Sequence, residues 1–586
     1  MTFLLGVESS LSGKRWIARE FDERVAMALS QRLGVSELSG RVMASRGVSL
    51  DEAPTFLNPT LRDLLPDPNH FKGMLVAVER LTKAIQNEEL IAIWGDYDVD
   101  GATSSALLRR FLNAVGAKST IYIPDRLTEG YGPNSQALSA LKEQGVQVVV
   151  TVDCGTTSFE PLAHAAEIGL DVIVVDHHDA EASLPKSVSV INPKRMDEDG
   201  RYSHLAAVGM TFIFAVGLNR ALREADWFGK DRVEPDLRNL LDLVALGTVC
   251  DVVPLVGLNR AFVMQGLKVM ARRSNPGIVA LADVASVNEA PEAYHAGYVL
   301  GPRVNAGGRV GESYLGANLL STDNASQAAE IAAQLHAYNK DRQELEQVVL
   351  DEAIAQVDGV EHSSVVLAVG TGWHPGVIGI VASRLKERYS LPACVIALKD
   401  GQGHGSGRSI TGIDLGNAII AARQSGLLVK GGGHAMAAGF TVSEDNLEEF
   451  KAFLSERIAG EISEQDVRPT YKCDGVISPS GVTPALVEEL EQIGPFGQGN
   501  AQPRFVLENV KVSRSDVVGR DHVRCFLTDS FGVRLKAIAF RALDTDLGQA
   551  LLQHGGRNLH IAGRLKLDTW GGGTSVQLLI DDAVNA

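Results

Sequence analysis

Residues 93–105 read IWGDYDVDGATSS. Three carboxylates, those of Asp96, Asp98 and Asp100, stand at alternate positions directly after an apolar run, and a glycine follows at once. The apolar residues, LIAIW at 90–94, are typical of a buried β-strand. In an open parallel sheet, ligands bind just outside the carboxyl ends of the strands. The stretch therefore predicts a strand with a charged site at its end.

The surrounding chain alternates short apolar segments with amphipathic ones. We expect strands at 90–94, 119–124, 146–152 and 171–176, and helices at 103–116, 134–145 and 160–169. Gly101 is interpreted as permitting the turn after the first strand, and Thr103–Ser105 as starting the next helix. Continuous Val/Ile runs between helical segments are typical of a parallel sheet buried on both faces. The predicted fold class is α/β, with right-handed βαβ crossovers.

Acidic and imidazole side chains also follow other predicted elements. Asp153 follows the third strand, the fourth ends in Asp176, His177 and His178, and an apolar helical stretch ends at Asp251. A single aspartate in such a place is most often a helix cap or turn residue, and a histidine pair is most often a hydrogen-bonded loop feature. The joint pattern is different, because nothing basic in the same loops can neutralise it. Such charges repel one another unless a counter-charge is bound.

Divalent cations are the simplest counter-charge for this cluster. Carboxylate oxygens with one or two imidazoles suit Mn²⁺ or Mg²⁺. A carboxylate that bridges two such ions about 3.5–4 Å apart is the usual arrangement for phosphoester hydrolysis. The sequence thus favours a two-metal hydrolase.

The overall charge bears on possible partners. The 586 residues carry 55 Lys+Arg and 72 Asp+Glu, a formal net charge of −17, which would ordinarily count against a nucleic-acid partner. Residues 467–586, however, contain 13 basic and 13 acidic residues, so the excess of acid lies upstream. Bound divalent cations would offset part of that excess.

Localisation is predicted from what the sequence lacks. No segment reaches the roughly 20 apolar residues that a membrane span needs, and 205–218 is predicted to be a buried helix. The N-terminus, MTFLLGVESS, has no basic start and no small-residue cleavage site, so we expect a cytoplasmic protein without a membrane partner. The five cysteines are scattered without a C-x-x-C pair, which argues against a zinc module or a disulfide framework.

A chain of this length is expected to form three or four domains. The segment before residue 358 contains no Gly or Pro over 34 positions, which predicts one long helix between two domains. Five β-like runs near the C-terminus predict a small barrel such as an oligonucleotide-binding (OB) fold, with a sandwich as the alternative. The predicted parts are an N-terminal extension packing on the core (1–75), a catalytic α/β domain (76–323), the long helix (324–357), a second, smaller α/β domain (358–462) and the barrel (467–586).

These motifs together resemble the DHH phosphoesterase superfamily, which is named for the triplet Asp176-His177-His178. DYDVDG, TVDCG, DHH and GTVCDVVPL occur in the order that the superfamily shows. Within it, the chain is most similar to the RecJ family of bacterial single-strand-specific 5′→3′ DNA exonucleases. The RecJ-like segments are DYDVDGATS, GPRVNAGGRVGES at 301–313, GSGRS at 405–409, GGGHAMAAGF at 431–440 and GPFGQGNAQPRF at 494–505. The resemblance implies a DHH catalytic domain, a DHHA1-type second domain and an OB barrel.

The resemblance also implies a ligand set for two divalent ions, Mn²⁺ or Mg²⁺. The implied ligands are Asp98, Asp100, Asp153, His177 and Asp251. Further ligands, orienting groups or acid–base participants would be Asp96, Asp176 and His178. Many smaller relatives have a histidine at the position of Trp94, and Asp96 would substitute for it here. We therefore count Asp96 among the predicted ligands, and all eight residues among the catalytic candidates.

Glycine-rich segments supply candidate substrate contacts. GPRVNAGGRVGES combines two arginines with four glycines, which suits close backbone approach and forked donors to phosphate. Its candidates are Arg303, Asn305 and Arg309, and an ordinary interdomain turn is the alternative. GHGSGRS at 403–409 offers Ser406, Arg408 and Ser409. The resemblance implies that the first two of these hold a terminal 5′-phosphate.

Other candidates are weaker. His434 follows three glycines, and the resemblance has it facing the scissile phosphate across an interdomain cleft, with a structural glycine turn as the alternative. Trp373 and His374 suit either base stacking or simple packing. The barrel carries basic residues near its early strands, as a groove for a single strand would, although a balanced solvated surface has the same charges. These basic residues are Lys472, Arg504, Lys511, Arg514, Arg520 and Arg524.

The resulting hypothesis is a metal-dependent exonuclease for single-stranded DNA that releases 5′-mononucleotides in the 5′→3′ direction, in DNA recombination and repair. The strand would enter the cleft between the two α/β domains. The resemblance implies a single-stranded-DNA-binding protein and a RecQ-type helicase as partners, and we expect a monomer. One alternative is a DHH enzyme for short oligoribonucleotides or cyclic dinucleotides, which would have little use for the barrel. The other is a catalytically inactive replication scaffold, which would be expected to lose ligands that this chain keeps.

Overall fold

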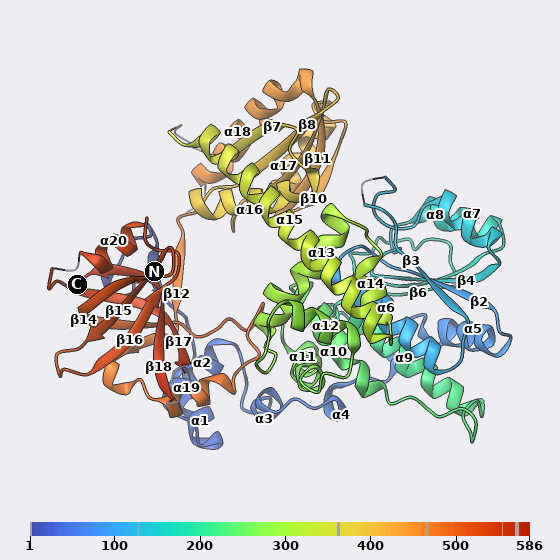
Figure 1. The fold of residues 1–586 in the computed structure, drawn as a ribbon, viewed down its shortest axis with the longest axis horizontal. Helices are drawn as coiled ribbons and strands as arrows, with labels where there is room; N and C mark the ends of the chain where they lie inside the picture. The colour runs from blue at the N-terminus through green and yellow to red at the C-terminus, as the bar shows by residue number, and fades with distance from the viewer. Residues whose placement is uncertain (1–2, 127, 360–363, 465–466, 554, 569–573) are drawn as a thin grey trace. The chain divides into compact units, whose positions relative to one another are not determined.

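The computed structural model describes the chain except residues 1–2, 127, 360–363, 465–466, 554 and 569–573 (Figure 1). The chain forms two compact units. The first contains residues 1–304, 313–333 and 470–586, and the second contains residues 305–312 and 334–469. No helix among the described residues is long and apolar enough to cross a membrane.

The first unit contains the predicted parallel sheet, in the strand order β3-β2-β4-β5-β6 (Figure 1). Its strands are β2 (Leu90–Trp94), β3 (Ser119–Tyr122), β4 (Val146–Val152), β5 (Asp171–Val175) and β6 (Ser189–Ile191). Its helices are α5 (Met74–Gln86), α6 (Val99–Ala114), α7 (Ser135–Glu143), α8 (Phe159–Glu167), α9 (Ala207–Glu224), α10 (Leu241–Cys250), α11 (Gly257–Met270) and α12 (Pro276–Val284), with the short η2 (Pro68–His70) and η3 (Leu237–Leu240). The predicted α/β class is confirmed, whereas β6 is too short to give a periodic signal in the sequence.

The start of α6 differs from our prediction. The helix begins at Val99, four residues before the predicted start, because the carboxylate of Asp98 caps it by accepting a hydrogen bond from the Gly101 N–H at 3.0 Å. Gly101 therefore lies in the first helical turn and does not form a separate turn. A Cβ at Gly101 would lie 2.6 Å from the backbone nitrogen of Asp96. The glycine is needed so that the strand end and the helix start can approach closely.

We expect Gly101→Ala to lower the melting temperature by about 2–10 °C and to reduce activity, because the new methyl group meets backbone that cannot rotate away. Differential scanning fluorimetry with an activity assay measures both effects. Gly460→Ala is the matched control, since Gly460 is exposed within α18 (Leu447–Glu464) and its added Cβ would meet nothing within 4 Å. The control should keep or raise the melting temperature. Equal melting temperatures for Gly101→Ala and the wild type would contradict this account.

Residues 301–310 of the segment GPRVNAGGRVGES form a helix, so the alternative of an ordinary interdomain turn is wrong for these residues. A continuous helical run comprises the π-helix η4 (His295–Leu300) and α13 (Gly301–Val310). A Cβ at Gly301 would collide with the Cys250 thiol, and one at Gly307 would lie 2.7 Å from the Glu312 carbonyl oxygen. These glycines serve close packing. Two helices follow, α14 (Leu315–Ser321) and the predicted long helix α15 (Ala325–Val357).

The C-terminal segment of the first unit is a closed barrel, which confirms the predicted OB fold (Figure 1). The closed order is β14-β15-β16-β18-β17, with β17 pairing back to β14. The strands are β14 (Phe505–Val518), β15 (His522–Thr528), β16 (Arg534–Ala539), β17 (Asn558–Asp568) and β18 (Ser575–Asn585). Accessory elements are β12 (Thr470–Cys473), β13 (Gly475–Ile477), η6 (Pro479–Gly481), α19 (Pro484–Glu491) and α20 (Asp546–Leu552).

The N-terminal extension packs on this barrel. Its elements are η1 (Leu4–Gly6), β1 (Arg15–Ala18), α1 (Glu23–Leu33), α2 (Glu37–Ser45), α3 (Ala53–Leu57) and α4 (Leu61–Leu64). Leu29 and Met43 share a hydrophobic cluster with the barrel residue Leu507, and the Trp16 Nε1–H donates to Asp582 at 2.9 Å. The later part of the extension contacts the sheet domain as well: α4 packs on α11, and the Gln265 amide of α11 donates to the Pro59 carbonyl at 3.0 Å. The sequence predicts that α1 and α2 have apolar faces, but it does not indicate which distant segment these faces cover.

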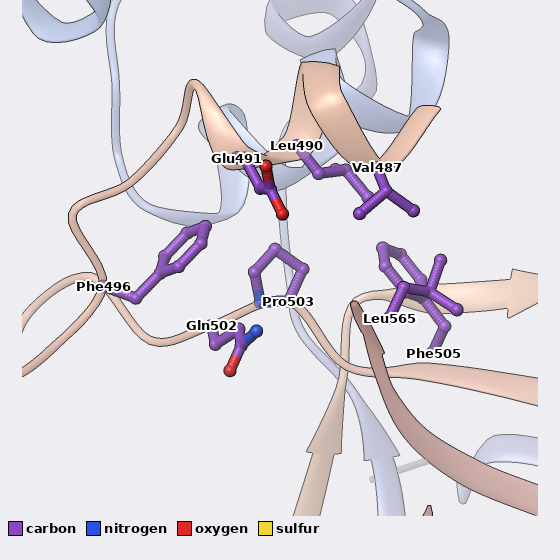
Figure 2. A pocket seen from close by; sticks show the side chains of 8 residues that line it. All are labelled: Val487, Leu490, Glu491, Phe496, Gln502, Pro503, Phe505 and Leu565. Atoms are coloured by element: carbon purple, nitrogen blue, oxygen red, sulfur yellow. The ribbon is translucent and has the colours of Figure 1, made fainter. Parts of the chain in front are cut away.

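The RecJ-like segment 494–505 joins the barrel to the helices of the sheet domain. The buried guanidinium of Arg260, on α11, donates to the carbonyls of Phe56, at 2.6 Å, and Gly494. The Leu255 N–H donates to the Gln498 carbonyl at 2.8 Å. Figure 2 shows a pocket beside this segment, lined by Val487, Leu490, Glu491, Phe496, Gln502, Pro503, Phe505 and Leu565. The segment is therefore hydrogen-bonded to the chain at Leu255, only four residues after Asp251.

The second unit is the predicted smaller α/β domain. Its sheet has the order β10-β11-β9-β8-β7. Its elements are β7 (Val366–Thr371), α16 (Pro375–Tyr389), β8 (Ala393–Lys399), β9 (Gln402–Arg408), α17 (Leu415–Gln424), β10 (Lys430–His434), β11 (Ala437–Ser443), η5 (Glu444–Asn446) and α18. Trp373 is buried and its indole N–H donates to Glu352 at 2.6 Å, so it packs and does not offer a base-stacking face. His374 caps α16 by accepting from the Gly376 N–H.

Candidate metal centre and substrate-binding residues

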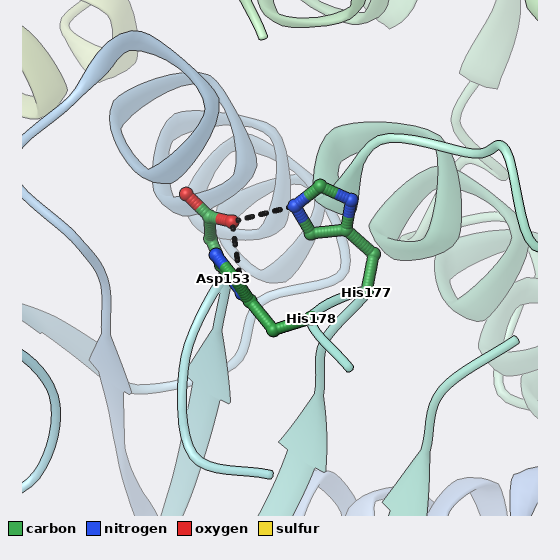
Figure 3. A group of neighbouring side chains, drawn as sticks. All are labelled: Asp153, His177 and His178. Carbon is green, nitrogen blue, oxygen red and sulfur yellow. Dashed lines mark ion pairs between the residues drawn. The ribbon is translucent and has the colours of Figure 1, made fainter. Parts of the chain in front are cut away.

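The carboxyl ends of β2, β4 and β5 bring the predicted ligands together. Three sets of side chains each have ligand atoms within 4.8 Å of one another. The sets are Asp96, Asp98 and Asp153; Asp153, His177 and His178; and Asp100, His177 and Asp251. Because Asp153 and His177 each belong to two sets, the three sets form one continuous centre. Figure 3 shows Asp153 beside both imidazoles, with its Oδ1 3.3 Å from His177 Nε2 and 3.9 Å from His178 Nδ1.

Asp153 is aimed by an uncommon backbone conformation. Its φ of +62° lies in the left-handed region, which aspartate tolerates better than most residues other than glycine. Its N–H donates to the Val175 carbonyl at 3.1 Å, which ties the end of β4 to that of β5. Strained conformations of this kind cluster at functional sites.

His177 is oriented so that one nitrogen faces the carboxylates. Its Nδ1 lies 3.0 Å from the Leu205 carbonyl oxygen. A carbonyl only accepts hydrogen bonds, so Nδ1 carries the proton and Nε2 presents its lone pair to Asp153 and Asp100. Burial, aided by the charge of His178, lowers the pKa of His177 to about 4. The ring is therefore neutral at pH 7, as a metal ligand must be.

The carboxylates are crowded: Asp96, Asp100 and Asp153 are buried, and Asp98 and Asp251 are half-buried. Asp100 accepts hydrogen bonds from the N–H groups of Ala207 and Val208, at 2.7 and 2.9 Å, at the start of α9. Burial and the charge of Asp98 nevertheless raise the pKa of Asp100 to about 7 and that of Asp96 to about 8. Burial and the charge of Asp100 raise the pKa of Asp251 to about 9 and that of Asp153 well above its usual range. Without a counter-charge, these groups resist ionising together.

The side chains present fit divalent cations. Asp96 Oδ1 and Asp251 Oδ2 are buried and accept no hydrogen bond from any residue that the structure describes. Buried polar atoms are rarely left without a partner, and both belong to the three ligand sets. Carboxylate oxygens with one neutral imidazole nitrogen suit Mn²⁺ or Mg²⁺, and no thiolate joins the sets described.

Asp176 and His178 form a pair that supports the centre. Asp176 accepts hydrogen bonds from the Thr156 N–H at 3.0 Å, the His177 N–H at 2.7 Å and His178 Nδ1 at 2.8 Å. Burial opposes ionisation of Asp176, but the hydrogen bonds from His178 and Thr156 outweigh it and hold the pKa of Asp176 below its usual range. Burial likewise opposes the charged form of His178, yet Asp176 outweighs it and raises the pKa of His178. Asp176 therefore organises the loop from behind the ligand sets.

Two supporting residues, Tyr131 and Asn192, were not predicted from the sequence. The Tyr131 hydroxyl donates to the Asp153 carbonyl at 3.1 Å and lies 3.3 Å from His178 Nδ1. The Asn192 amide donates to Thr156 Oγ1 at 2.9 Å and to the His178 carbonyl at 2.8 Å. Neither residue belongs to one of the motifs that supply the candidate ligands, so only the folded chain reveals its role.

Comparison with known proteins identifies three families along the chain. Residues 90–248 match the DHH family, N-terminal domain, residues 362–460 match the DHHA1 domain, and residues 473–582 match the RecJ OB domain. The single-stranded-DNA-specific exonuclease RecJ of Escherichia coli (strain K12) is 35% identical over 577 residues, which are 96% of this chain and 98% of that protein. The chain belongs to the RecJ family.

Other RecJ proteins agree with this assignment. RecJ of Bacillus subtilis (strain 168) is 33% identical over 585 residues, which cover 98% of this chain and 71% of that protein. The crystal structure of RecJ in complex with Mn²⁺ from Thermus thermophilus superposes with a TM-score of 0.81 at 28% identity, covering 97% of this chain and 79% of that one. The RecJ fold therefore extends over nearly the whole chain.

The substrate candidates of the segment GPRVNAGGRVGES all lie on α13, at its start and towards its end. On the first unit, the half-buried Arg303 donates to the Val299 carbonyl at 2.6 Å. On the second unit, Asn305 is half-buried in α13, and the Arg309 guanidinium donates to the Gly376 carbonyl at 3.2 Å. Their substrate roles stay predictions.

Ser406, Arg408 and His434 share one face of the second sheet. Arg408 donates to the Ser406 hydroxyl at 3.2 Å, and His434 pairs with Ala437, which pairs with Arg408. Directly paired residues point to the same side of a sheet. His434 is exposed, at the end of the β10–β11 hairpin. Ser409 is fully buried and donates to the Ile413 carbonyl at 2.8 Å, so we leave it out of the proposed substrate site.

Proposed function

We propose that this chain is a metal-dependent exonuclease that hydrolyses the phosphodiester bonds of single-stranded DNA. One observation carries the proposal: a centre of carboxylates and imidazole, complete in every predicted ligand, occurs in a chain that aligns from end to end with single-stranded-DNA-specific exonucleases. A catalytically inactive scaffold would have no reason to keep mutually repelling buried carboxylates. The OB barrel supports a single-stranded substrate, because such barrels bind oligonucleotides.

We propose Asp96, Asp98, Asp100, Asp153, His177 and Asp251 as ligands of two Mn²⁺ or Mg²⁺ ions. When bound, such ions activate water and offset phosphate charge. His177 contributes its neutral Nε2, and the amides at the start of α9 hold Asp100 in place. Asp176 favours the protonated form of His178, and the His178 side chain is 46% exposed. His178 is thus suited to donate a proton to the 3′-oxygen that leaves when water attacks phosphorus.

We also propose that hydrolysis starts at the 5′ end of the strand. Ser406 and Arg408 would hold the terminal 5′-phosphate, and His434 would face the scissile phosphate. Arg303, Asn305 and Arg309 would contact the phosphates that follow. A hydroxyl beside a guanidinium on one strand face suits a phosphate dianion. Hydrolysis would then release 5′-mononucleotides and proceed 5′→3′. From the resemblance, we further propose work in recombination and repair as a cytoplasmic monomer, beside a single-stranded-DNA-binding protein and a RecQ-type helicase.

The test is degradation of one strand carrying different labels at its two ends. With Mn²⁺ or Mg²⁺, the 5′ label should appear first as a mononucleotide and the 3′ label last, because the terminal phosphate is held at the 5′ end. EDTA should abolish the reaction, and a duplex without single-stranded ends should resist it. Earlier release of the 3′ label would refute the polarity, and metal-independent cleavage would refute the mechanism.

The alternative is a DHH enzyme for dinucleotides. Its metal centre would be the same, so the two enzymes are told apart by their substrate preference. The measurement compares kcat/KM for a long strand with kcat/KM for the dinucleotide that corresponds to the 5′ end of that strand. We expect a clear preference for the long strand, because the barrel can contribute binding energy only when the substrate reaches it. A preference for the dinucleotide would favour the alternative.

A further inference from the structure

Two exposed tyrosines lie on the helix that packs against α10, the helix that ends at the candidate ligand Asp251. Tyr294 is 60% exposed and Tyr298 is 76% exposed, and both are in the first unit. Their rings stack on each other, with centroids 5.5 Å apart and planes 25° apart. A stacked pair of this kind holds its rings in a fixed orientation while leaving most of their area accessible.

The opposite side of this helix is fixed against α10, which ends at Asp251. His295, Ala296 and Leu300 are buried. The Cys250 thiol donates to the Ala296 carbonyl at 3.4 Å, and an added Cβ on Gly297 would lie 3.1 Å from Val249. The tyrosine-bearing helix is therefore anchored to the last turn before a predicted metal ligand.

The helix is also locked at its start and continues into a predicted phosphate contact. His295 accepts from the Glu292 N–H at 3.0 Å through Nδ1, and its Nε2 lies 2.9 Å from Glu289. Residues 295–300 form a π-helix, a conformation that is frequent at functional sites. Arg303 follows Tyr298 by five residues in the same helical run.

The charges around the tyrosines indicate which part of a nucleic acid they meet. Glu289 and Glu292 lie on the same segment, and carboxylates repel phosphate. Bases are uncharged and have flat faces that stack on aromatic rings whatever the sequence. The surface therefore suits bases, with the sugar-phosphate backbone turned away.

We propose that Tyr294 and Tyr298 form a platform on which bases of the single-stranded substrate stack beside the metal centre. This proposal rests on the proposed function, since it takes single-stranded DNA as the substrate. The platform would hold the strand while its end is processed and would favour unpaired bases, whose faces are accessible.

The test compares the Tyr294→Ala/Tyr298→Ala variant with the matched Tyr294→Phe/Tyr298→Phe variant. For a strand of about 20 nucleotides, the alanine variant should raise KM between about 5-fold and about 100-fold, while kcat stays near that of the wild type. The phenylalanine variant should behave as the wild type, because stacking needs the ring and not the hydroxyl. Neither variant should change the melting temperature or the stabilisation by Mn²⁺, since both side chains are exposed.

A binding measurement without hydrolysis keeps this test separate from the nuclease activity. Fluorescence anisotropy in EDTA reports the affinity of strands that each carry one abasic position. The wild type should lose affinity at one or two positions, and the alanine variant should be insensitive there. Wild-type binding with this pattern but no degradation would refute the exonuclease and leave the platform standing. Wild-type affinity in the alanine variant, an equal loss in the phenylalanine variant, or no abasic-sensitive position would refute the platform.

Discussion

Asp153→Asn is expected to lower kcat on single-stranded DNA by about 10³-fold or more. Asp153 belongs to two of the three ligand sets, and its carboxylate is the closest to the imidazole ring of His177. Asparagine keeps the shape of the side chain but removes the charge that both sets share. Steady-state release of mononucleotides measures the loss. The variant should also lose the rise in melting temperature that Mn²⁺ gives the wild type.

The control for this prediction is another buried aspartate. Asp242, on α10, is almost fully buried, and burial raises its pKa to about 6, yet it belongs to none of the ligand sets among the described residues. Asp242→Asn should keep activity and the response to Mn²⁺. Without metal, Asp153→Asn should melt no lower than the wild type, because it removes one of several repelling buried charges. Near-wild-type activity in Asp153→Asn would refute its role as a shared ligand.

The sheet and the grouping of the candidate metal ligands could be predicted from sequence because their signals are local. Buried parallel strands are continuous apolar runs, so β2, β4 and β5 stand out, and topology then places the residues after them at one edge. Asp96, Asp153 and His177 could thus be grouped without coordinates. The barrel could also be predicted from the sequence, since its five strands are separated by turn signals.

The remaining parts of the site depend on packing between distant segments. Glycines in GPRVNAGGRVGES indicate a loop by local propensity, but tertiary contacts such as that of Gly301 with Cys250 make them packing positions within a helix. Ser409 and Asp176 have the residue types of site groups. Whether such a group faces a ligand or the backbone depends on how the chain folds around it: Asp176 accepts from Thr156, 20 residues away, and Ser409 donates to the Ile413 carbonyl, four residues on.

Adding Mg²⁺ to the metal-free protein should raise the melting temperature by about 5–10 °C at saturating concentration, and by more at pH 8.5 than at pH 6. The folded pKa values of Asp100, Asp96 and Asp251, about 7, 8 and 9, exceed the value of about 4 expected in the unfolded chain. The metal-free folded state therefore binds more protons than the unfolded state between about pH 4 and pH 9. Its stability falls as the pH rises through that window. Bound Mg²⁺ needs these carboxylates ionised, so its contribution grows in the same direction.

Net charge also lowers stability as the pH rises, because the chain carries a formal charge of −17 at pH 7. The Asp96→Asn/Asp251→Asn variant separates the effect of net charge from that of the raised pKa values. It keeps nearly all of the net charge but removes two of the carboxyl groups whose pKa is raised. Without metal, its melting temperature should fall less than that of the wild type between pH 6 and pH 8.5. Parallel slopes for the two proteins would assign the pH dependence to net charge. A metal-induced rise that shrinks with pH would contradict carboxylate ligation, because protonated ligands would then bind Mg²⁺ as well as ionised ones.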